Sequence, residues 1–305
     1  MTCAAVVNPR SAGGATGRRW SGLARALESR VGDVTTRFTE RPGHATVLTR
    51  ELLERGFDRV IAVGGDGTIN EVANGFLRDD QPVRPGASLA ILPAGTGGDF
   101  RRTLGIAGIR EALDVLARGS TRPIDVGRVS YDARDGSRAT RYFVNVVSFG
   151  MGGEVAARSR NWLSPLGGRL AFLWATAVVF FQYQGKTVRL RLDDGAPEEF
   201  TVMNVAVGNG RYHGGGMHVC PRASTDDGLL EVTVIDRLGM IEMVRSLPVL
   251  YSENIYVHPK TRHRRARRVT AESAEATSIE VDGEPLGQLP VEITVLPRRL
   301  PVCTG

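Results

Sequence analysis

The chain has 305 residues, of which 42% are hydrophobic and 24% are charged. This balance excludes a fibrous or disordered protein and allows one large core or two ordinary domains. The formal charge of +6 favours anionic partners without choosing among nucleic acid, an anionic membrane and a nucleotide. Three widely spaced cysteines indicate neither a disulfide framework nor a metal site, and fit a reducing cytoplasm.

Short apolar runs alternate with amphipathic stretches over residues 1–124, which predicts an α/β domain with a mostly parallel sheet. The apolar residues before Asn8 are expected to form a first buried strand. Val60–Val63 is expected to form another, ending in a glycine loop. Thr68 and Glu71 have the spacing of a helix capping box, so a helix should follow that loop.

A second strand with a glycine loop is expected at Ser88–Leu92, where Thr96 would cap a helix that begins near Asp99. An amphipathic helix over residues 109–117 should end at Gly119. Two glycine loops would then lie at one edge of the sheet.

Residues 125–292 are expected to form a β-rich, sandwich-like domain, because extended runs are separated there by glycine turns. Residues from about 293 to 305 are expected to return to the first domain. The apolar stretch Leu170–Phe181 is too short to span a bilayer and is interpreted as a buried helix, with a lipid-facing element as the alternative. The predicted strands are Tyr142–Val147, Thr187–Leu192, Phe200–Val207, Leu229–Ile235 and Val291–Leu296.

The loop Gly64–Thr68 is the strongest chemical signal in the sequence. Its glycines let backbone N–H groups approach phosphate oxygens, and a carboxylate at Asp66 is favourable there if it holds Mg²⁺. A tight turn with a capping aspartate is the structural alternative. Neither a P-loop with its lysine nor a dinucleotide-binding glycine motif occurs in a credible position.

Taken together, several ordered motifs resemble the diacylglycerol kinase catalytic domain family, which includes soluble bacterial lipid kinases, sphingosine kinases and ceramide kinases. The resemblance covers nearly the whole chain. It is carried by Asn8-Pro9-Arg10-Ser11, Thr39 before Gly43-His44-Ala45, Gly64 to Asn70, Gly95-Thr96-Gly97-Gly98-Asp99-Phe100, Asp226-Asp227-Gly228 and Asp282-Gly283-Glu284.

The resemblance implies a nucleotide-binding α/β domain of the kind found in NAD kinase and phosphofructokinase, a lipid-binding β-sandwich, and an active site in the cleft between them. Asp66 would serve the catalytic Mg²⁺, and a carboxylate of Asp282 or Glu284 would take the proton of the lipid hydroxyl. Asp99 and Arg102 would face the lipid substrate. The residues implied to bind ATP are Asn8, Pro9, Arg10, Ser11, Ala12, Thr39, Gly64, Gly65, Asp66, Gly67, Thr68, Ile69, Asn70, Gly95 and Thr96.

A second, structural Mg²⁺ is implied at Asp227, with carbonyl groups of Ser224 and Leu229; an ordinary Asp-Gly turn is the alternative. Asp282-Gly283 between apolar runs also predicts a hairpin turn. The chain departs from the family's common residues at two places, with Gly98 where asparagine is usual and Ala12 where glycine is usual.

The expected activity is transfer of the γ-phosphate of ATP to a lipid hydroxyl, with diacylglycerol as the first substrate hypothesis. A sphingoid base or another lipid, an NAD kinase, and a non-catalytic nucleotide- or lipid-binding homologue remain alternatives. The expected partner is a lipid presented at a membrane surface, no nucleic acid is expected, and a homodimer is left open. The basic run Arg262–Arg268 is a solvated strand edge or loop, or a peripheral membrane contact at the inner face of the membrane. Nucleic-acid binding by this run is the third alternative, and no recognisable motif supports it.

Overall fold

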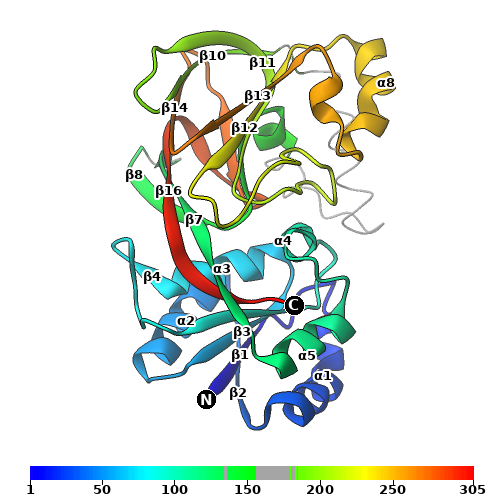
Figure 1. Cartoon of the computed structure of the whole chain (residues 1–305), viewed down its shortest axis with the longest axis vertical. Coiled ribbons are helices and arrows are strands. Elements are labelled where there is room, and N and C mark those ends of the chain that lie inside the picture. The colour runs from blue at the N-terminus through cyan, green and yellow to red at the C-terminus, as the bar shows by residue number, and fades with distance from the viewer. Residues whose placement is uncertain (134–135, 156–178, 180–182, 184) are drawn as a thin grey trace. The chain divides into compact units, whose positions relative to one another are not determined.

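A computed structural model describes residues 1–133, 136–155, 179, 183 and 185–305. The chain forms two compact units. Unit 1 contains Met1–Val126 and Leu296–Gly305, and unit 2 contains Gly127–Val295. These boundaries lie two and three residues from the expected positions 124 and 292. Two long strands, β7 (Thr121–Ala133) and β16 (Glu284–Cys303), each contribute residues to both units (Figure 1).

Unit 1 is built on a parallel sheet with the strand order β2-β1-β3-β6. The end of β16 continues this sheet in parallel beside β6, where Val302 pairs with Leu89. Every residue of β1 and β3 is buried, as expected for central strands covered on both faces. The predicted α/β fold is therefore confirmed. The strands are β1 (Cys3–Val7), β2 (Val34–Phe38), β3 (Arg59–Gly64) and β6 (Ser88–Pro93), with a small hairpin of β4 (Leu77–Arg78) and β5 (Gln81–Pro82).

Helices cover both faces of the parallel sheet (Figure 1). The helix α2 packs against α3, and α1 packs against α5, which is the arrangement that right-handed crossovers produce. The helix predicted over 109–117 is α5, and it ends at Gly119, whose φ is 72°. The buried guanidinium of Arg59 donates to the carbonyl oxygens of Leu116 and Gly119 and so balances that helix end. The helices are α1 (Ala15–Val31), α2 (His44–Glu54), α3 (Asp66–Phe76), α4 (Asp99–Thr103) and α5 (Ile109–Arg118).

Unit 2 is an antiparallel β-sandwich, with one run of strands in the order β13-β12-β11-β10-β14-β16. Strand β9 pairs with β11 and β15, and β15 pairs with β16. Buried valines dominate its core. The elements are β8 (Arg138–Phe143), β9 (Val146–Gly150), β10 (Lys186–Leu192), β11 (Glu198–Gly208), β12 (Leu230–Asp236), β13 (Thr261–Ala266), β14 (Arg268–Glu272), β15 (Ser278–Val281), helix α8 (Met240–Leu250) and the 3₁₀ turn η1 (Ile255–Val257).

Four of the five strands predicted in this half are present, but the run Tyr142–Val147 is not one strand. It divides into β8 and β9, and the chain leaves the extended pattern at Val144 and Asn145. The physical reason is the carboxylate of Asp282, which accepts hydrogen bonds from the backbone N–H groups of Val144 and Asn145 and so takes them out of the strand ladder. The stretch Leu170–Phe181, interpreted as a buried helix, lies outside the described residues apart from Val179.

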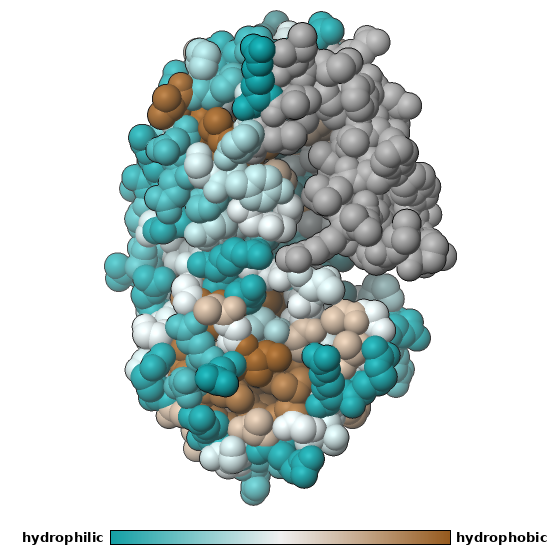
Figure 2. Space-filling view, turned by 90° about the vertical axis from the view of Figure 1, so that its right-hand side faces the viewer, coloured by the Kyte–Doolittle hydropathy of each residue, from teal (hydrophilic) through white to brown (hydrophobic). Residues whose placement is uncertain are grey.

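The surface carries many charged groups. Most of the coloured residues in Figure 2 are hydrophilic or intermediate, and the larger group of hydrophobic residues lies in the lower half of the view. None of the helices within the described ranges combines the length and the apolar character that a bilayer crossing requires.

Candidate functional site

Two glycine loops meet at the carboxyl edge of the parallel sheet. β3 ends at Gly64, which pairs with Pro93 at the end of β6. The carbonyl oxygen of Gly64 accepts hydrogen bonds from the backbone N–H groups of Ala94 and Gly95, at 3.1 and 3.0 Å. A Cβ atom on Gly95 would lie only 2.3 Å from the Cα of Gly65. Glycine is required here because backbone touches backbone, and this sheet edge is where ligands of open α/β folds bind.

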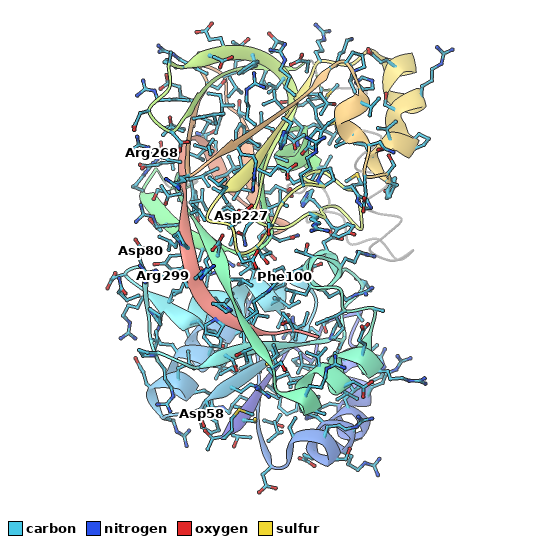
Figure 3. All side chains as sticks on the ribbon, viewed as in Figure 1. Asp58, Asp80, Phe100, Asp227, Arg268 and Arg299 are labelled. Atoms are coloured by element: carbon cyan, nitrogen blue, oxygen red, sulfur yellow. The ribbon has the colours of Figure 1, made fainter. Side chains whose placement is uncertain are left out.

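Asp66 links the first loop to the helix after the second. Its Oδ2 accepts hydrogen bonds from the N–H groups of Gly98 and Asp99 at 2.6 and 3.1 Å, and its Oδ1 accepts one from Phe100 at 3.2 Å. Phe100 lies on α4 (Figure 3). The helix begins at Asp99 as predicted, but the predicted cap by Thr96 is wrong. The carboxylate of Asp66 takes that role from another element.

The N-terminal segment joins the same edge. The N–H of Asn8 donates to the carbonyl oxygen of Val63, and its side-chain amide donates to Oγ1 of Thr68 at 3.1 Å. Ser11 contacts the hydroxyl of Thr16, which donates to the carbonyl oxygen of Ala94 at 2.8 Å. The structure therefore brings the residues expected from Asn8 to Ser11, Gly64 to Thr68, and Gly95 into one cluster of loops.

Other residues expected to bind nucleotide differ in their accessibility. Thr96 and Arg10 are exposed, whereas the side chains of Ile69 and Asn70 are buried, with exposed fractions of 1% and 0%. Those two side chains lie on the buried part of α3 rather than at the surface of the loop. Thr39 is also buried, and its N–H donates to the carbonyl oxygen of Val7. Of the remaining members of the expected set, Pro9 and Ala12 lie in the loop after β1, and Gly67 lies in the first turn of α3.

The predicted capping box at Thr68 and Glu71 is wrong. α3 begins three residues earlier than the box predicts, with Asp66 as its first residue, Gly65 at the N-cap and no side-chain cap. Glu71 instead accepts hydrogen bonds from the N–H groups of Gly43 and Ala45, at 2.8 and 3.1 Å, and so caps α2. Sequence spacing identified Glu71 as a capping residue but could not identify the helix that it caps.

Two positions where the chain departs from the family's common residues have unusual backbone geometry. Ala12 has a φ of 51°, in the left-handed region that favours glycine. Gly98 has a φ of 126°, and a Cβ there would lie 2.4 Å from Nε of Arg101. The loop conformation at residue 98 therefore suits glycine rather than asparagine.

The pair expected to face the lipid is joined by an ion pair. Arg102 and Asp99 lie three residues apart on α4, with Nη1 of Arg102 2.7 Å from Oδ1 of Asp99. Asp99 is buried, with an exposed fraction of 7%. The charge of Asp99 is thus balanced locally, on the helix that Asp66 caps.

In unit 2, Asp282 and Gly283 form a two-residue hairpin between β15 and β16, with φ of 49° and 86°. The predicted turn is confirmed, and both positive angles suit a type I′ turn. Oδ1 of Asp282 accepts hydrogen bonds from the N–H groups of Asn145 and Val146, and Oδ2 accepts one from Val144, all at 2.9–3.0 Å. Asp282 is buried at 6% exposed, so it fixes the break between β8 and β9. Glu284, half-buried, opens β16.

Asp227, expected to hold a second Mg²⁺, lies in the turn before β12 (Figure 3). Its Oδ1 accepts a hydrogen bond from the N–H of Leu229 at 3.0 Å, and its Oδ2 forms an ion pair with Arg265. The hydroxyl of Ser224 donates to Asp226 at 2.7 Å. Within the described residues, no group of three or more histidine, cysteine or acidic side chains has the arrangement of a metal site. A cation at Asp227 would have to displace Arg265.

Comparison with known proteins agrees with this architecture. Residues 2–129 match the model of the diacylglycerol kinase catalytic domain. Residues 145–304 match the model of the YegS C-terminal NAD kinase beta sandwich-like domain. The chain belongs to the diacylglycerol kinase family, and it is a lipid kinase by that membership.

Individual relatives extend the comparison over most of the chain. A protein of Pseudomonas aeruginosa named "Probable lipid kinase YegS-like" is 34% identical over 88% of this chain and 84% of its own length. A diacylglycerol kinase of Staphylococcus haemolyticus is 28% identical over 99% of this chain and 88% of its own.

Two solved structures share the fold. A diacylglycerol kinase from Bacillus anthracis covers 100% of this chain and 97% of its own, with a TM-score of 0.73 at 24% identity. Yeast NADH kinase in complex with NADH covers 99% of this chain and 82% of its own, with a TM-score of 0.52 at 12% identity. At such identities the likeness concerns the fold alone.

Proposed function

We propose that this lipid kinase transfers the γ-phosphate of ATP to the hydroxyl of a lipid alcohol, with diacylglycerol as the first candidate. The observation that carries the proposal is the joined pair of glycine loops, held at the carboxyl edge of the sheet by Asp66 and by contact between Gly65 and Gly95. Loops of this kind present backbone N–H groups to phosphates. The names of relatives such as the Staphylococcus haemolyticus diacylglycerol kinase support the choice of lipid.

The carboxylate of Asp66 fits a role in holding Mg²⁺. A carboxylate offers about four lone-pair positions, and the amides of Gly98, Asp99 and Phe100 use three. Oδ1 accepts from Phe100 and keeps room for a cation or its bound water. When bound, Mg²⁺ would neutralise charge on the phosphates of ATP. The N–H groups of Gly98, Asp99 and Phe100 fix the orientation of the Asp66 carboxylate. This orientation is what the protein itself contributes to holding the cation.

Asp282 and Glu284 are the proposed groups for the lipid hydroxyl. Phosphoryl transfer depends on positioning and charge neutralisation, with a carboxylate that accepts the proton of the attacking hydroxyl. Three backbone amides hold Asp282 in place, so we assign it the positioning of the hairpin. Glu284, two residues on, is then the candidate proton acceptor.

A transfer assay tests the proposal. The protein is incubated with γ-labelled ATP, Mg²⁺ and, in parallel, diacylglycerol, a sphingoid base and NAD. We expect labelled lipid from the native protein, and none from Asp66→Ala or Glu284→Gln. Label on NAD alone would favour the NAD kinase alternative. Binding of ATP without transfer to any acceptor would favour the non-catalytic one.

The basic run Arg262–Arg268 is a candidate for peripheral membrane contact. It comprises most of β13, Arg267 and the first residue of β14, and β13 forms the edge of its run of strands. Arg262, Arg265 and Arg268 form ion pairs with Asp236, Asp227 and Asp194, so their charge is partly balanced. Arg264 and Arg267 are exposed beside them.

Vesicle binding tests this contact. Replacing both Arg264 and Arg267 by serine should weaken binding to vesicles that contain anionic lipid. The matched control replaces Arg189 and Arg191, which are exposed on β10. Equal binding by the native protein and both double variants would contradict membrane contact through the run Arg262–Arg268.

A further inference from the structure

An aromatic side chain is exposed at the edge of the sheet where the glycine loops meet. Phe38 is the last residue of β2 and is 47% exposed. Of the large hydrophobic side chains that the described part of unit 1 exposes, Phe38 is the aromatic one, and the others are Met1 and Val47. A single exposed apolar residue needs no explanation by itself. The position of Phe38 and the groups around it therefore decide what its ring can do.

The sheet register places Phe38 beside these loops. Phe38 pairs with Val7, the last residue of β1, and Val7 pairs on its other side with Val63 of β3. The chain then continues from Val7 to Asn8, whose N–H donates to the carbonyl oxygen of Val63 at 3.0 Å. Phe38 therefore lies two strand spacings, about 10 Å, from β3, where the first glycine loop begins. A nucleotide whose phosphates bind this loop can reach Phe38 with its base, because the ribose lies between them.

A buried tryptophan supports the ring of Phe38. Trp20, on α1, is 9% exposed, and the centroids of the two rings lie 6.2 Å apart with their planes at 83°. This edge-to-face geometry is one that aromatic pairs favour. In such a pair one ring presents its edge to the other, so Trp20 leaves at least one face of the Phe38 ring uncovered. A supported ring with an uncovered face is what a planar base needs for stacking.

The charged groups near Phe38 in the chain indicate what kind of molecule would cover it. Arg10, in the loop after β1, and Arg41, three residues after Phe38, are both exposed. The N–H of Arg10 donates to Oδ1 of Asn8 at 3.0 Å, which ties this loop to the edge of the sheet. A hydrocarbon or an apolar protein surface would gain nothing from these arginines. A nucleotide combines a planar base with phosphates that positive charge attracts.

We propose that Phe38 stacks on the base of the nucleotide whose phosphates the glycine loops bind, and thereby positions ATP. The inference rests on the use of ATP proposed above. Stacking of a base on an aromatic side chain should tighten ATP binding roughly 5- to 100-fold. Inorganic tripolyphosphate carries the phosphates without a base, so its affinity should not depend on Phe38.

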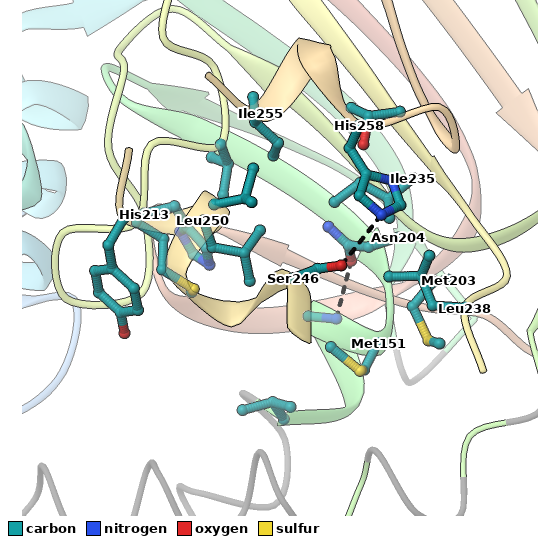
Figure 4. A pocket seen from close by; sticks show the side chains of 17 residues that line it. Met151, Met203, Asn204, His213, Ile235, Leu238, Ser246, Leu250, Ile255 and His258 are labelled. Carbon is teal, nitrogen blue, oxygen red and sulfur yellow. Dashed lines mark hydrogen bonds between the residues drawn. The ribbon is translucent and has the colours of Figure 1, made fainter. Parts of the chain in front are cut away.

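Four variants test the assignment. Phe38→Ala removes the ring, and Phe38→Leu removes its π face but keeps apolar contact with Trp20, which keeps the test open if the alanine variant does not fold. Phe38→Trp restores an aromatic face. Tyr251→Ala is the matched control, because Tyr251 is an aromatic residue of similar exposure, 53%, and lines a pocket of unit 2 (Figure 4) instead of the loops of unit 1.

The measurement is titration calorimetry of each protein with ATP and with tripolyphosphate, both in the presence of Mg²⁺, which needs no turnover. We expect the native protein, Phe38→Trp and Tyr251→Ala to bind ATP alike. Phe38→Ala and Phe38→Leu should raise the Kd for ATP roughly 5- to 100-fold. The Kd for tripolyphosphate should be the same in all five proteins.

Several results would overturn the stacking role. An equal Kd for ATP in all five proteins would do so, and so would a parallel loss of ATP and tripolyphosphate in Phe38→Ala and Phe38→Leu, because that loss would place the damage in the loops. Failure of the native protein to bind ATP would overturn both the stacking role and the proposed function. The expected pattern of ATP binding without transfer of label to any lipid would overturn the proposed transfer alone.

Discussion

Replacing Asp282 by asparagine should destabilise unit 2 by an amount that follows from its three amide contacts. The asparagine carbonyl can replace Oδ1 and keep the hydrogen bonds from Asn145 and Val146. The amide NH₂ then faces the N–H of Val144, where Oδ2 accepted a bond. A buried donor without an acceptor costs about 1–3 kcal/mol, and the two remaining bonds each lose roughly 0.5–1 kcal/mol of charge assistance. The sum is about 2–5 kcal/mol.

Urea unfolding and hydrogen exchange measure this cost. Asp282→Asn should lower the free energy of unfolding and speed exchange of the amides at 144–146. Glu284→Gln is the control on the same hairpin, and we expect it to change the unfolding free energy by less than about 0.5 kcal/mol while lowering phosphate transfer. If Asp282→Asn is as stable as Glu284→Gln and its amides stay protected, the anchoring role argued for Asp282 is refuted.

Other predictions concern unit 1 and the turn before β12. Gly95→Ala should destabilise the protein by about 1–3 kcal/mol or more and abolish phosphate transfer, because its Cβ would meet the backbone of Gly65; Gly22→Ala in α1, where a Cβ meets open space, should be neutral or stabilising by chemical denaturation. The hydrogen bond from Arg84 lowers the pKa of Asp58 to about 2. The ionised Asp58 therefore stabilises the folded protein at pH values above its ordinary pKa near 3.9, and this stabilisation is lost as the pH falls towards 2. The difference in melting temperature between the native protein and Asp58→Asn should shrink between pH 5 and 2, and a constant difference would contradict the assignment. Arg265→Ala should leave Asp227 without its counter-ion, so Mg²⁺ should raise the melting temperature of the nucleotide-free variant more than that of native protein; an equal rise in both would contradict this balance.

The sequence predicted elements well where a local pattern determines them. The apolar run Val60–Val63 became the buried strand β3, and Gly119 ended α5 in a left-handed conformation. Asp282-Gly283 became the expected turn. In each case the signal lies within a few adjacent residues: apolar side chains, a residue tolerant of positive φ, or a turn dipeptide.

Prediction failed where a side chain acts on a distant element. Asp66 caps α4 across 32 to 34 residues, and Glu71 caps α2 across 26 to 28. Asp282 interrupts a strand pattern 136 to 138 residues away. These carboxylates were recognised as capping or catalytic residues, but their amide partners depend on which loops the fold brings together, and spacing along the chain does not contain that information.

The last strand affects the order in which the protein can be completed. Leu300, Val302 and Cys303 of β16 are buried in unit 1, and Val302 pairs with Leu89 of β6. A ribosome therefore makes all of unit 2 before it makes the residues that finish the sheet of unit 1. Unit 1 is the first unit to be synthesised, but its sheet is completed last, when the end of β16 pairs with β6. Until then the edge of β6 that β16 covers stays unpaired. Loss of residues 296–305 would harm unit 1 more than unit 2, although unit 2 directly precedes them in the chain.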